Sequence, residues 1–264
     1  MELRGRTVLV TGATGGLGAA IARALAARGA VPVLTGRRTD VLAPLADSIA
    51  GRAIAADLSD PADVDRLLAE AGDVDVLIAN AALPGSGHIT SFSIEDIDRA
   101  LAVNLRAPMV MARRLAEPMA ARGSGHLVFV SSLSGKVASG GGSVYAATKF
   151  GLRGFAHGLR EDLRDSGVGV SVVLPGFIRD GGMFHDANVK LPRFVGTKTP
   201  EEVAAGVLRA IERDRAEVDI APFSMRAGAA FAGLAPELSA RVQRRLGGAK
   251  VAEDMARGQA GKRA

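Results

Sequence analysis

Residues 7–18, TVLVTGATGGLG, decide how this chain folds. The run Thr7–Val10 is apolar and typical of a buried strand, and from Leu17 onward apolar residues recur at helical spacing. The segment between them is rich in glycine, which permits positive φ and lets the backbone approach a bulky anion. A helix that begins there offers unpaired N–H groups and its positive dipole end to that anion. The stretch therefore predicts a strand, a phosphate-binding loop and a helix.

The same alternation continues along the chain. Six further apolar runs predict strands at Val31–Thr35, Ala53–Ala56, Val74–Ala79, His126–Ser131, Gly169–Leu174 and Glu217–Ile220. Helical spacing lies between them, at 42–49, 60–71, 142–166 and 200–212, and in a long stretch after residue 93. Ser59 is the expected N-cap of one helix, and Ser93 with Asp96 the expected capping pair of another.

Hydrophobic strands that alternate with helices predict the α/β class, with a parallel sheet covered on both faces. The expected architecture is a single Rossmann-type doubly wound parallel sheet with a C-terminal helical extension. A length of 264 residues, 48% of them hydrophobic, suits one large α/β domain. We expect residues 1–221 to form the dinucleotide-binding catalytic domain. Residues 222–264 form the expected extension, with a disordered end at 258–264.

Composition excludes several classes of protein. The chain has no cysteine, so disulfides and thiolate metal sites are ruled out. His88, His126 and His157 have no partners at metal-site spacing, so no metal is expected. The N-terminal residues lack the apolar segment of a secretion signal, and no apolar run is long enough to span a bilayer. We expect a cytoplasmic protein.

The net charge of +5 does not indicate nucleic-acid binding. Basic residues are scattered rather than arranged in a stripe, and one tyrosine with no tryptophan offers little for base stacking. An anionic cofactor accounts for part of the positive charge equally well.

The residues after the second strand favour NADP(H) over NAD(H). An acidic residue at this position of a dinucleotide fold binds the adenosine ribose hydroxyls, and this chain has Gly36 there. Arg37 and Arg38 follow and can form charge-assisted hydrogen bonds to a 2′-phosphate. The alternative is a pair of solvated arginines at a strand end.

The segment Tyr145–Lys149 carries the expected chemistry. Tyr145, the only tyrosine, and Lys149 are four residues apart, so on a helix they share a face. A nearby ammonium and a cationic nicotinamide favour the phenolate, which lowers the tyrosine pKa and makes proton transfer practical. Ser131 and Ser132 end the fifth strand, where parallel sheets place ligands, and one of them can hydrogen-bond a substrate oxygen.

From about Thr7 to Leu174 the chain resembles the short-chain dehydrogenase/reductase family. Thr11, Gly12, Gly16 and Gly18 match its Thr-Gly-x-x-x-Gly-x-Gly loop. The resemblance implies a catalytic set of four residues, Asn104, Ser132, Tyr145 and Lys149. It selects Ser132 over Ser131 by its interval to the tyrosine. It also implies that Lys149 binds the nicotinamide ribose, and that Asn104 holds a water beside Lys149 in a proton relay.

The resemblance places further residues around the cofactor. Asp57 would bind the adenine amino group, Asn80 would lie near the adenosine ribose or the central sheet, and the turn Pro175–Gly176 would approach the nicotinamide. The expected cofactor-binding set is Gly12, Thr14, Gly16, Leu17, Gly18, Arg37, Arg38, Asp57, Leu58, Asn80, Tyr145, Lys149, Pro175, Gly176 and Ile178. The chain departs from the family at Asp180, where a threonine usually binds the carboxamide. The nicotinamide is then held differently, or the backbone of the next two glycines replaces that contact.

The implied function is hydride transfer between NADP(H) and a carbonyl or alcohol substrate, with Tyr145 as the proton donor. One alternative is a 3-oxoacyl-thioester reductase, and another is a non-catalytic NADP-binding regulator, which the retained catalytic set argues against. The family commonly forms homodimers or homotetramers through the long helices after Ser93 and around Tyr145, so we expect one of these assemblies.

Two segments bear on the substrate and on partners. The predicted substrate loop is 177–199, and its apolar candidates are Met183, Phe184, Leu191, Phe194 and Val195. In the tail, apolar residues recur every four positions, at Leu234, Leu238, Val242 and Leu246. Three arginines flank them, at Arg241, Arg244 and Arg245. This pattern predicts an amphipathic helix that docks on the domain or on a partner subunit. The less favoured alternative is an anionic membrane surface.

Overall fold

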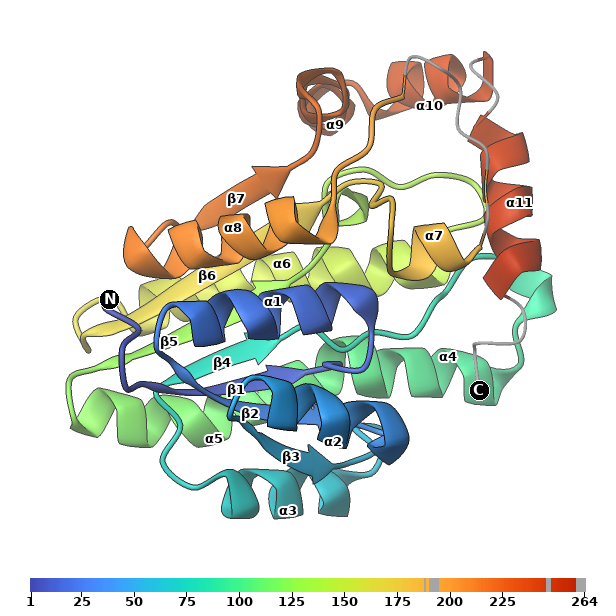
Figure 1. Cartoon of the computed structure of the whole chain (residues 1–264). Helices are drawn as coiled ribbons and strands as arrows, with labels where there is room; N and C mark the ends of the chain where they lie inside the picture. The colour runs from blue at the N-terminus through green and yellow to red at the C-terminus, as the bar shows by residue number, and fades with distance from the viewer. Residues whose placement is uncertain (188, 190–194, 246–247, 260–264) are drawn as a thin grey trace.

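The computed structural model describes residues 1–187, 189, 195–245 and 248–259, and its centre is one parallel sheet (Figure 1). The strand order is β3-β2-β1-β4-β5-β6-β7, and every neighbouring pair is parallel. The strands are β1 (Thr7–Thr11), β2 (Val31–Gly36), β3 (Arg52–Ala55), β4 (Val76–Ala79), β5 (Gly125–Val130), β6 (Val168–Pro175) and β7 (Glu217–Ile220). The seven predicted strands are thus confirmed, with shifts of at most two residues at their ends.

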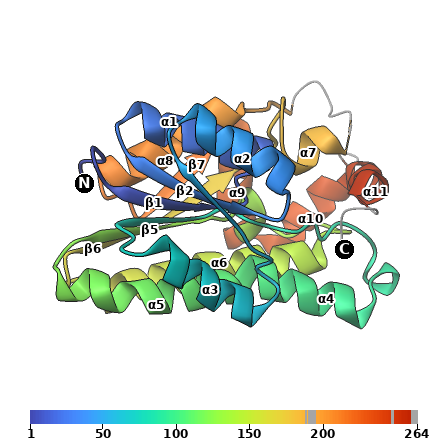
Figure 2. The same cartoon turned by 60° about the horizontal axis from the view of Figure 1, so that its bottom comes forward.

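Helices cover both faces of the sheet (Figure 2). On one face lie α1 (Gly16–Ala27), α2 (Thr39–Ser48) and α8 (Pro200–Glu212), and on the other lie α3 (Pro61–Ala71), α4 (Ile94–Leu101), α5 (Ala107–Ala121) and α6 (Ser143–Asp162). The doubly wound Rossmann-type architecture predicted from the sequence is confirmed.

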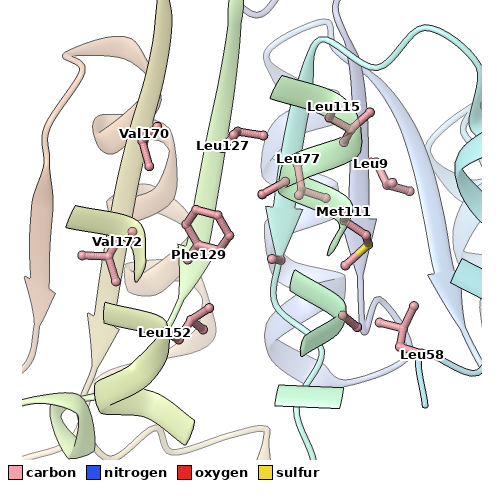
Figure 3. Packing of buried hydrophobic residues seen from close by; sticks show 14 of the residues in the cluster. Leu9, Leu58, Leu77, Met111, Leu115, Leu127, Phe129, Leu152, Val170 and Val172 are labelled. Atoms are coloured by element: carbon pink, nitrogen blue, oxygen red, sulfur yellow. The ribbon is translucent and has the colours of Figure 1, made fainter. Parts of the chain in front are cut away.

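Alternation along the strands creates two separate cores. In β1, Leu9 faces one core while Val8 and Val10 face the other, because successive strand side chains point to opposite faces. Figure 3 shows the core beneath α5 and α6, where Phe129 of β5 lies among leucine and valine side chains. Phe129 also meets Phe155 of α6 edge to face, with ring centroids 5.5 Å apart. These contacts fix α6 against the sheet, and α6 carries Tyr145 and Lys149.

Two helix starts test the capping predictions. The prediction that Ser59 caps α3 is wrong, because Asp60 is the N-cap and its carboxylate accepts from the amide of Ala62. Asp60 lies one residue nearer to Pro61, which occupies the first helical turn. The predicted capping box of α4 is confirmed, since Ser93 and Asp96 exchange backbone hydrogen bonds.

The long helical stretch after Ser93 is interrupted. Between α4 and α5 the backbone forms the π-helical segment η2 (Ala102–Arg106), which contains Asn104. π-Helical turns occur frequently at functional sites, because they displace backbone groups from regular pairing. No residue pattern in this stretch indicates the change of hydrogen bonding.

In the tail, the described residues form three helices, α9 (Phe223–Leu234), α10 (Pro236–Arg245) and α11 (Gly248–Gln259). The prediction of one amphipathic helix is therefore wrong, because Leu234 ends α9 whereas Leu238 and Val242 lie in α10. Leu246 lies outside the described residues. Pro236 cannot donate a helical hydrogen bond, which explains the break.

Two further results concern the end of the chain and the whole molecule. Residues 258–259 belong to α11, so the predicted disorder does not include them, and 260–264 lie outside the described part. Among the described helices none is long and apolar enough to cross a membrane.

Candidate active site

The carboxyl ends of the strands surround a cavity of about 960 Å³. It opens where the chain order reverses between β1 and β4, the place at which such sheets bind ligands. All but one of the predicted site residues line it: Gly12, Thr14, Gly16, Leu17, Gly18, Arg37, Arg38, Asp57, Leu58, Asn80, Ser132, Tyr145, Lys149, Pro175, Gly176 and Ile178. The exception is Asn104. Predicted residues up to 166 positions apart in the chain thus share one cavity.

The loop after β1 is held tightly against β4. Gly12 has a φ of +67°, and a Cβ there would lie 2.7 Å from the Cα of Ala81, so only glycine fits. The amide nitrogen of the Asn80 side chain donates to the carbonyl of Thr11 at 3.0 Å and lies 3.3 Å from that of Gly12. The Thr11 hydroxyl accepts from the amides of Asn80 and Ala81, each at 3.0 Å. Asn80 therefore shapes the phosphate loop from beneath.

The start of α1 suits a diphosphate. Gly15 is the N-cap and has no side chain to satisfy the first-turn amides, and no acidic residue lies in that turn. Gly16 is exposed at the cavity and carries no side chain, whereas a Cβ on Gly18 would lie 2.3 Å from the carbonyl oxygen of Gly12, so Gly18 lets α1 pack directly on the loop. Amides at a helix N-terminus, the positive dipole end and a glycine-lined surface together fit a dinucleotide pyrophosphate.

At the adenosine end of the cavity, a side chain at position 36 would be crowded by Thr14. A Cβ on Gly36 would lie 2.9 Å from the methyl carbon of Thr14. Arg38 crosses to the phosphate loop, where its guanidinium donates to the Thr14 carbonyl at 2.6 Å. Arg37 is exposed beside it and also lines the cavity. Positive charge therefore surrounds this end.

Asp57 follows β3 and is held as a carboxylate. Its Oδ1 accepts from the amide and the hydroxyl of Ser59 at 2.9 and 2.7 Å. Burial acts to raise its pKa, but the Ser59 hydrogen bonds and the charges of Arg99 and Arg37 outweigh that effect and lower the pKa. The carboxylate can accept from an exocyclic amine such as that of adenine.

Arg99 is a cavity residue that no sequence pattern indicates. It lies in α4, its guanidinium is 3.4 Å from Oδ2 of Asp57, and its Nε is buried with no hydrogen-bond partner among the described residues. A buried donor without a partner is costly and suits a ligand acceptor. The two residues are 42 positions apart, so no local pattern could have paired them.

Tyr145 and Lys149 occupy one wall of the cavity, as their spacing predicts. The Lys149 ammonium lies 5.5 Å from the centroid of the Tyr145 ring and donates to the carbonyl of Val130 at 3.0 Å. Lys149 is only 2% exposed, and Tyr145 is half-buried. The last residue of β5 thus fixes the lysine beside the phenol.

Burial sets the pKa values of this pair in the protein alone. Burial raises the pKa of Tyr145 to about 12, although its hydrogen-bonding interaction with Ser132 acts to lower it. Burial also lowers the pKa of Lys149 to about 8. Desolvation therefore dominates both groups in the protein alone, and the expected lowering of the tyrosine pKa by Lys149 together with a cationic nicotinamide stays a prediction. The phenol is held protonated, as a proton donor requires.

The two serines after β5 have different partners. The hydroxyl of Ser131 donates to the backbone carbonyl of Lys149 at 2.9 Å and is buried. The hydroxyl of Ser132 accepts from the amide of Ser134 at 3.1 Å and lies 3.5 Å from the Pro175 carbonyl. Ser131 therefore anchors α6, whereas Ser132 faces Tyr145 with a weakly engaged hydroxyl.

Asn104 is placed behind the cavity wall. Its side-chain oxygen accepts from the amide of Leu83 at 2.6 Å, and its nitrogen donates to the carbonyl of Leu83 at 2.9 Å. The residue is fully buried. The side chain thus fixes the loop after β4, and its role in a proton relay stays a prediction.

The substrate side of the cavity is apolar. Helix α7 (Met183–Asp186) lies within the predicted substrate loop, and Met183, Phe184 and Val195 line the cavity as expected. Leu191 and Phe194 lie outside the described residues. Asp180, which replaces the family's usual threonine, is exposed and pairs with Arg179 at 3.3 Å. The next two residues, Gly181 and Gly182, line the cavity. The second alternative, contact through the glycine backbone, fits this placement.

Helix α11 closes this side of the cavity, which the sequence did not predict. Met255 and Gln259 line the cavity, and the Gln259 amide donates to the Met183 carbonyl at 3.3 Å. A Cβ on Gly258 would lie 2.5 Å from the carbonyl oxygen of Ala187, so the helix packs directly on the chain after α7. The tail therefore contributes to the site.

Outside the cavity, His126 is buried and bonds the hydroxyl of Ser171 at 2.8 Å. Desolvation lowers its pKa to about 4. Within the ranges that the structure describes, no group of three histidine or acidic side chains could hold a metal ion.

Comparison with known proteins gives concordant matches. The family model described as short chain dehydrogenase matches residues 6–191. The ketoacyl reductase HetN of Nostoc sp. is 38% identical over 225 residues, which cover 82% of this chain and 78% of that protein. The 3-oxoacyl-[acyl-carrier-protein] reductase FabG of Escherichia coli is 32% identical over 67% of this chain and 75% of its own length. A short-chain dehydrogenase from Sphingobium yanoikuyae in complex with NADPH superposes with a TM-score of 0.75 at 30% identity, covering 81% of this chain and 87% of that one.

Proposed function

Because the chain belongs to the short-chain dehydrogenase/reductase family of oxidoreductases, whose members use a nicotinamide cofactor, we propose that it transfers a hydride between NADP(H) and a carbonyl or alcohol substrate. The proposal rests on one observation: Tyr145, Lys149 and Ser132 line the same cavity as the glycine loop. A proton donor and a dinucleotide cradle in one cavity are what carbonyl reduction requires.

Each residue of the site has a separate role in the proposed reaction. The cofactor, when bound, supplies the hydride. Ser132 orients the substrate oxygen, and the protonated Tyr145 donates its proton as negative charge develops on that oxygen. Lys149, fixed by the Val130 carbonyl, binds the ribose and favours the phenolate that proton donation leaves behind. Alcohol oxidation reverses these roles.

The proposed preference for NADP(H) rests on Gly36, Arg37 and Arg38. A side chain at position 36 would crowd Thr14, and the glycine there leaves this position without a carboxylate. Two arginines can form charge-assisted bonds with a 2′-phosphate, whereas a carboxylate would repel it. Similar structures include a serine dehydrogenase complexed with NADP⁺, with a TM-score of 0.75 at 28% identity.

The substrate class is proposed from the cavity wall. Met183, Phe184, Met225 and Met255 favour an apolar carbonyl compound, because methionine and aromatic side chains adapt to apolar ligands. A 3-oxoacyl thioester is the second candidate, because the relatives HetN and FabG are described as a ketoacyl reductase and a 3-oxoacyl-[acyl-carrier-protein] reductase.

The test is a substrate screen that follows NADPH absorbance with the full chain. Aliphatic and aromatic ketones are compared with 3-oxoacyl thioesters of matched chain length, and NADH is tested in parallel. Turnover of either class with NADPH supports the enzyme. Tight NADPH binding with no turnover of any carbonyl would favour the non-catalytic regulator instead.

Assembly and location remain proposals. Leu101, Met109 and Phe150 are exposed on α4, α5 and α6, where a homodimer or homotetramer would bury them. Cytoplasmic location and the division at residue 221 stay predictions.

A further inference from the structure

Helix α9 presents an apolar face outward. Phe223, Phe231 and Leu234 are 80%, 42% and 87% exposed. At 100° per residue they lie within an arc of about 80°, together with the exposed Ala227. The opposite side of the helix carries Met225 and the buried Ala229. The expectation that the tail docks its apolar side on the domain therefore does not describe this face.

Helix α10 continues the exposed apolar surface and adds charge. Leu238 and Val242 are 51% and 44% exposed on one side of the helix. Arg241 and Arg245 are four residues apart, lie along one edge of this apolar stripe, and are both exposed. The two helices pack against each other at the end of the molecule beyond β7 (Figure 1). We call the exposed faces of α9 and α10 the tail surface.

Charge decides which partner fits the tail surface. Exposed arginines at 226, 241, 244 and 245 outnumber the two nearby carboxylates, Glu237 and Asp219, which lie 3.8 Å from Arg241 and Arg226. A symmetric pair of chains would bring two copies of this net-positive patch together, which is electrostatically unfavourable. An anionic lipid surface accepts both the aromatic and leucine side chains and the guanidinium groups.

We propose that the tail surface binds the anionic headgroup region of a membrane peripherally. Phenylalanine and leucine side chains enter the boundary of the acyl chains, and the arginines contact lipid phosphates. The inner side of α9 carries Met225, which lines the cavity. If the proposed function holds, an apolar substrate dissolved in the bilayer lies close to the site that reduces it.

The experiment is flotation of the full-length protein with two kinds of vesicle. One is phosphatidylcholine alone, and the other is phosphatidylcholine with an equal amount of phosphatidylglycerol. The wild type is expected to float only with the anionic vesicles, and to dissociate in about 1 M salt, where the Debye length is about 3 Å. NADPH binding is measured on every variant, so that failure of the cofactor site is separated from failure of the surface.

Matched variants test charge at this location. Arg241→Gln with Arg245→Gln should lower the partition coefficient roughly thirtyfold, from a contribution of about fivefold for each arginine. The control is Arg113→Gln with Arg114→Gln, which removes the same charge from two exposed residues of α5. The control should float as the wild type does.

A second variant tests the apolar contribution. Phe223→Ser with Leu234→Ser replaces two exposed side chains, so the fold should persist, and partition should fall on the order of a hundredfold. The proposal is overturned if the wild type does not float at low salt, or if the α5 control loses as much binding. It is also overturned if the serine variant leaves flotation unchanged and only lowers the mass measured by sedimentation, because a second copy then covers the surface.

Discussion

Replacing Tyr145 with phenylalanine removes one hydroxyl from the cavity wall and leaves the ring. The contact between the Lys149 ammonium and the ring is kept, and so is the Lys149 bond to Val130. Cofactor affinity should therefore stay within about tenfold, since only the hydroxyl's own contact is lost. Turnover should fall, because water must now supply the proton.

The size of the loss follows from acidity. The pKa of Tyr145 is about 12. That of water is roughly 15.7. If about half of this pKa difference affects the transition state, the lower acidity of water alone slows the reaction roughly a hundredfold. This corresponds to an increase of about 3 kcal/mol in the activation free energy. Loss of positioning adds to this, so a fall of about 10²–10⁴ in kcat is expected.

The assay combines single-turnover NADPH oxidation, which isolates the chemical step, with fluorescence titration of NADPH. Ser132→Ala serves as a comparison that removes orientation but keeps the donor. If Tyr145→Phe retains more than about a tenth of the wild-type single-turnover rate, the phenol is not the proton donor and the reasoning is refuted.

Three further outcomes are expected. Arg37→Asp should weaken NADPH binding by about 10–100-fold, with NADH affected much less, because a charge-assisted bond is replaced by repulsion; equal effects on both cofactors in titrations would contradict this. His126 has a pKa of about 4 in the fold against 6.5 in the unfolded chain, so its contribution to stability is present above pH 6.5 and is lost as pH falls through 4. In urea unfolding, the free energy of unfolding of the wild type should fall between pH 7 and 4 by up to about 3 kcal/mol more than that of His126→Gln. Equal falls in the two proteins would show that another group titrates. Gly258→Ala should displace α11 from Ala187 and raise the substrate KM several-fold at unchanged NADPH affinity, whereas Arg257→Ala on the exposed side should change neither.

Much of the site was predictable because its signals are local. The glycine loop after β1, the Tyr145–Lys149 spacing and the serine at the end of β5 each occupy a few consecutive residues. The alternation of strands and helices then implies that the carboxyl ends of the strands meet at one edge. Sixteen of the predicted positions line one cavity for this reason.

Other features depend on contacts between distant segments. Arg99 reaches Asp57 across 42 positions, and Gln259 reaches Met183 across 76. The pKa of Tyr145 is set by burial, which spacing along a helix cannot report. The π-helical turn around Asn104 likewise has no signal in the local residue pattern.

The amino-acid order by itself determined the strands, their parallel arrangement and the identity of the reactive groups, because periodicity and glycine placement act within a few residues. Only the tertiary structure decided which buried groups lose water, which helix closes the substrate side and which apolar residues of the tail stay exposed. Those properties arise from segments far apart in the chain, and their free energies depend on the surroundings of each side chain.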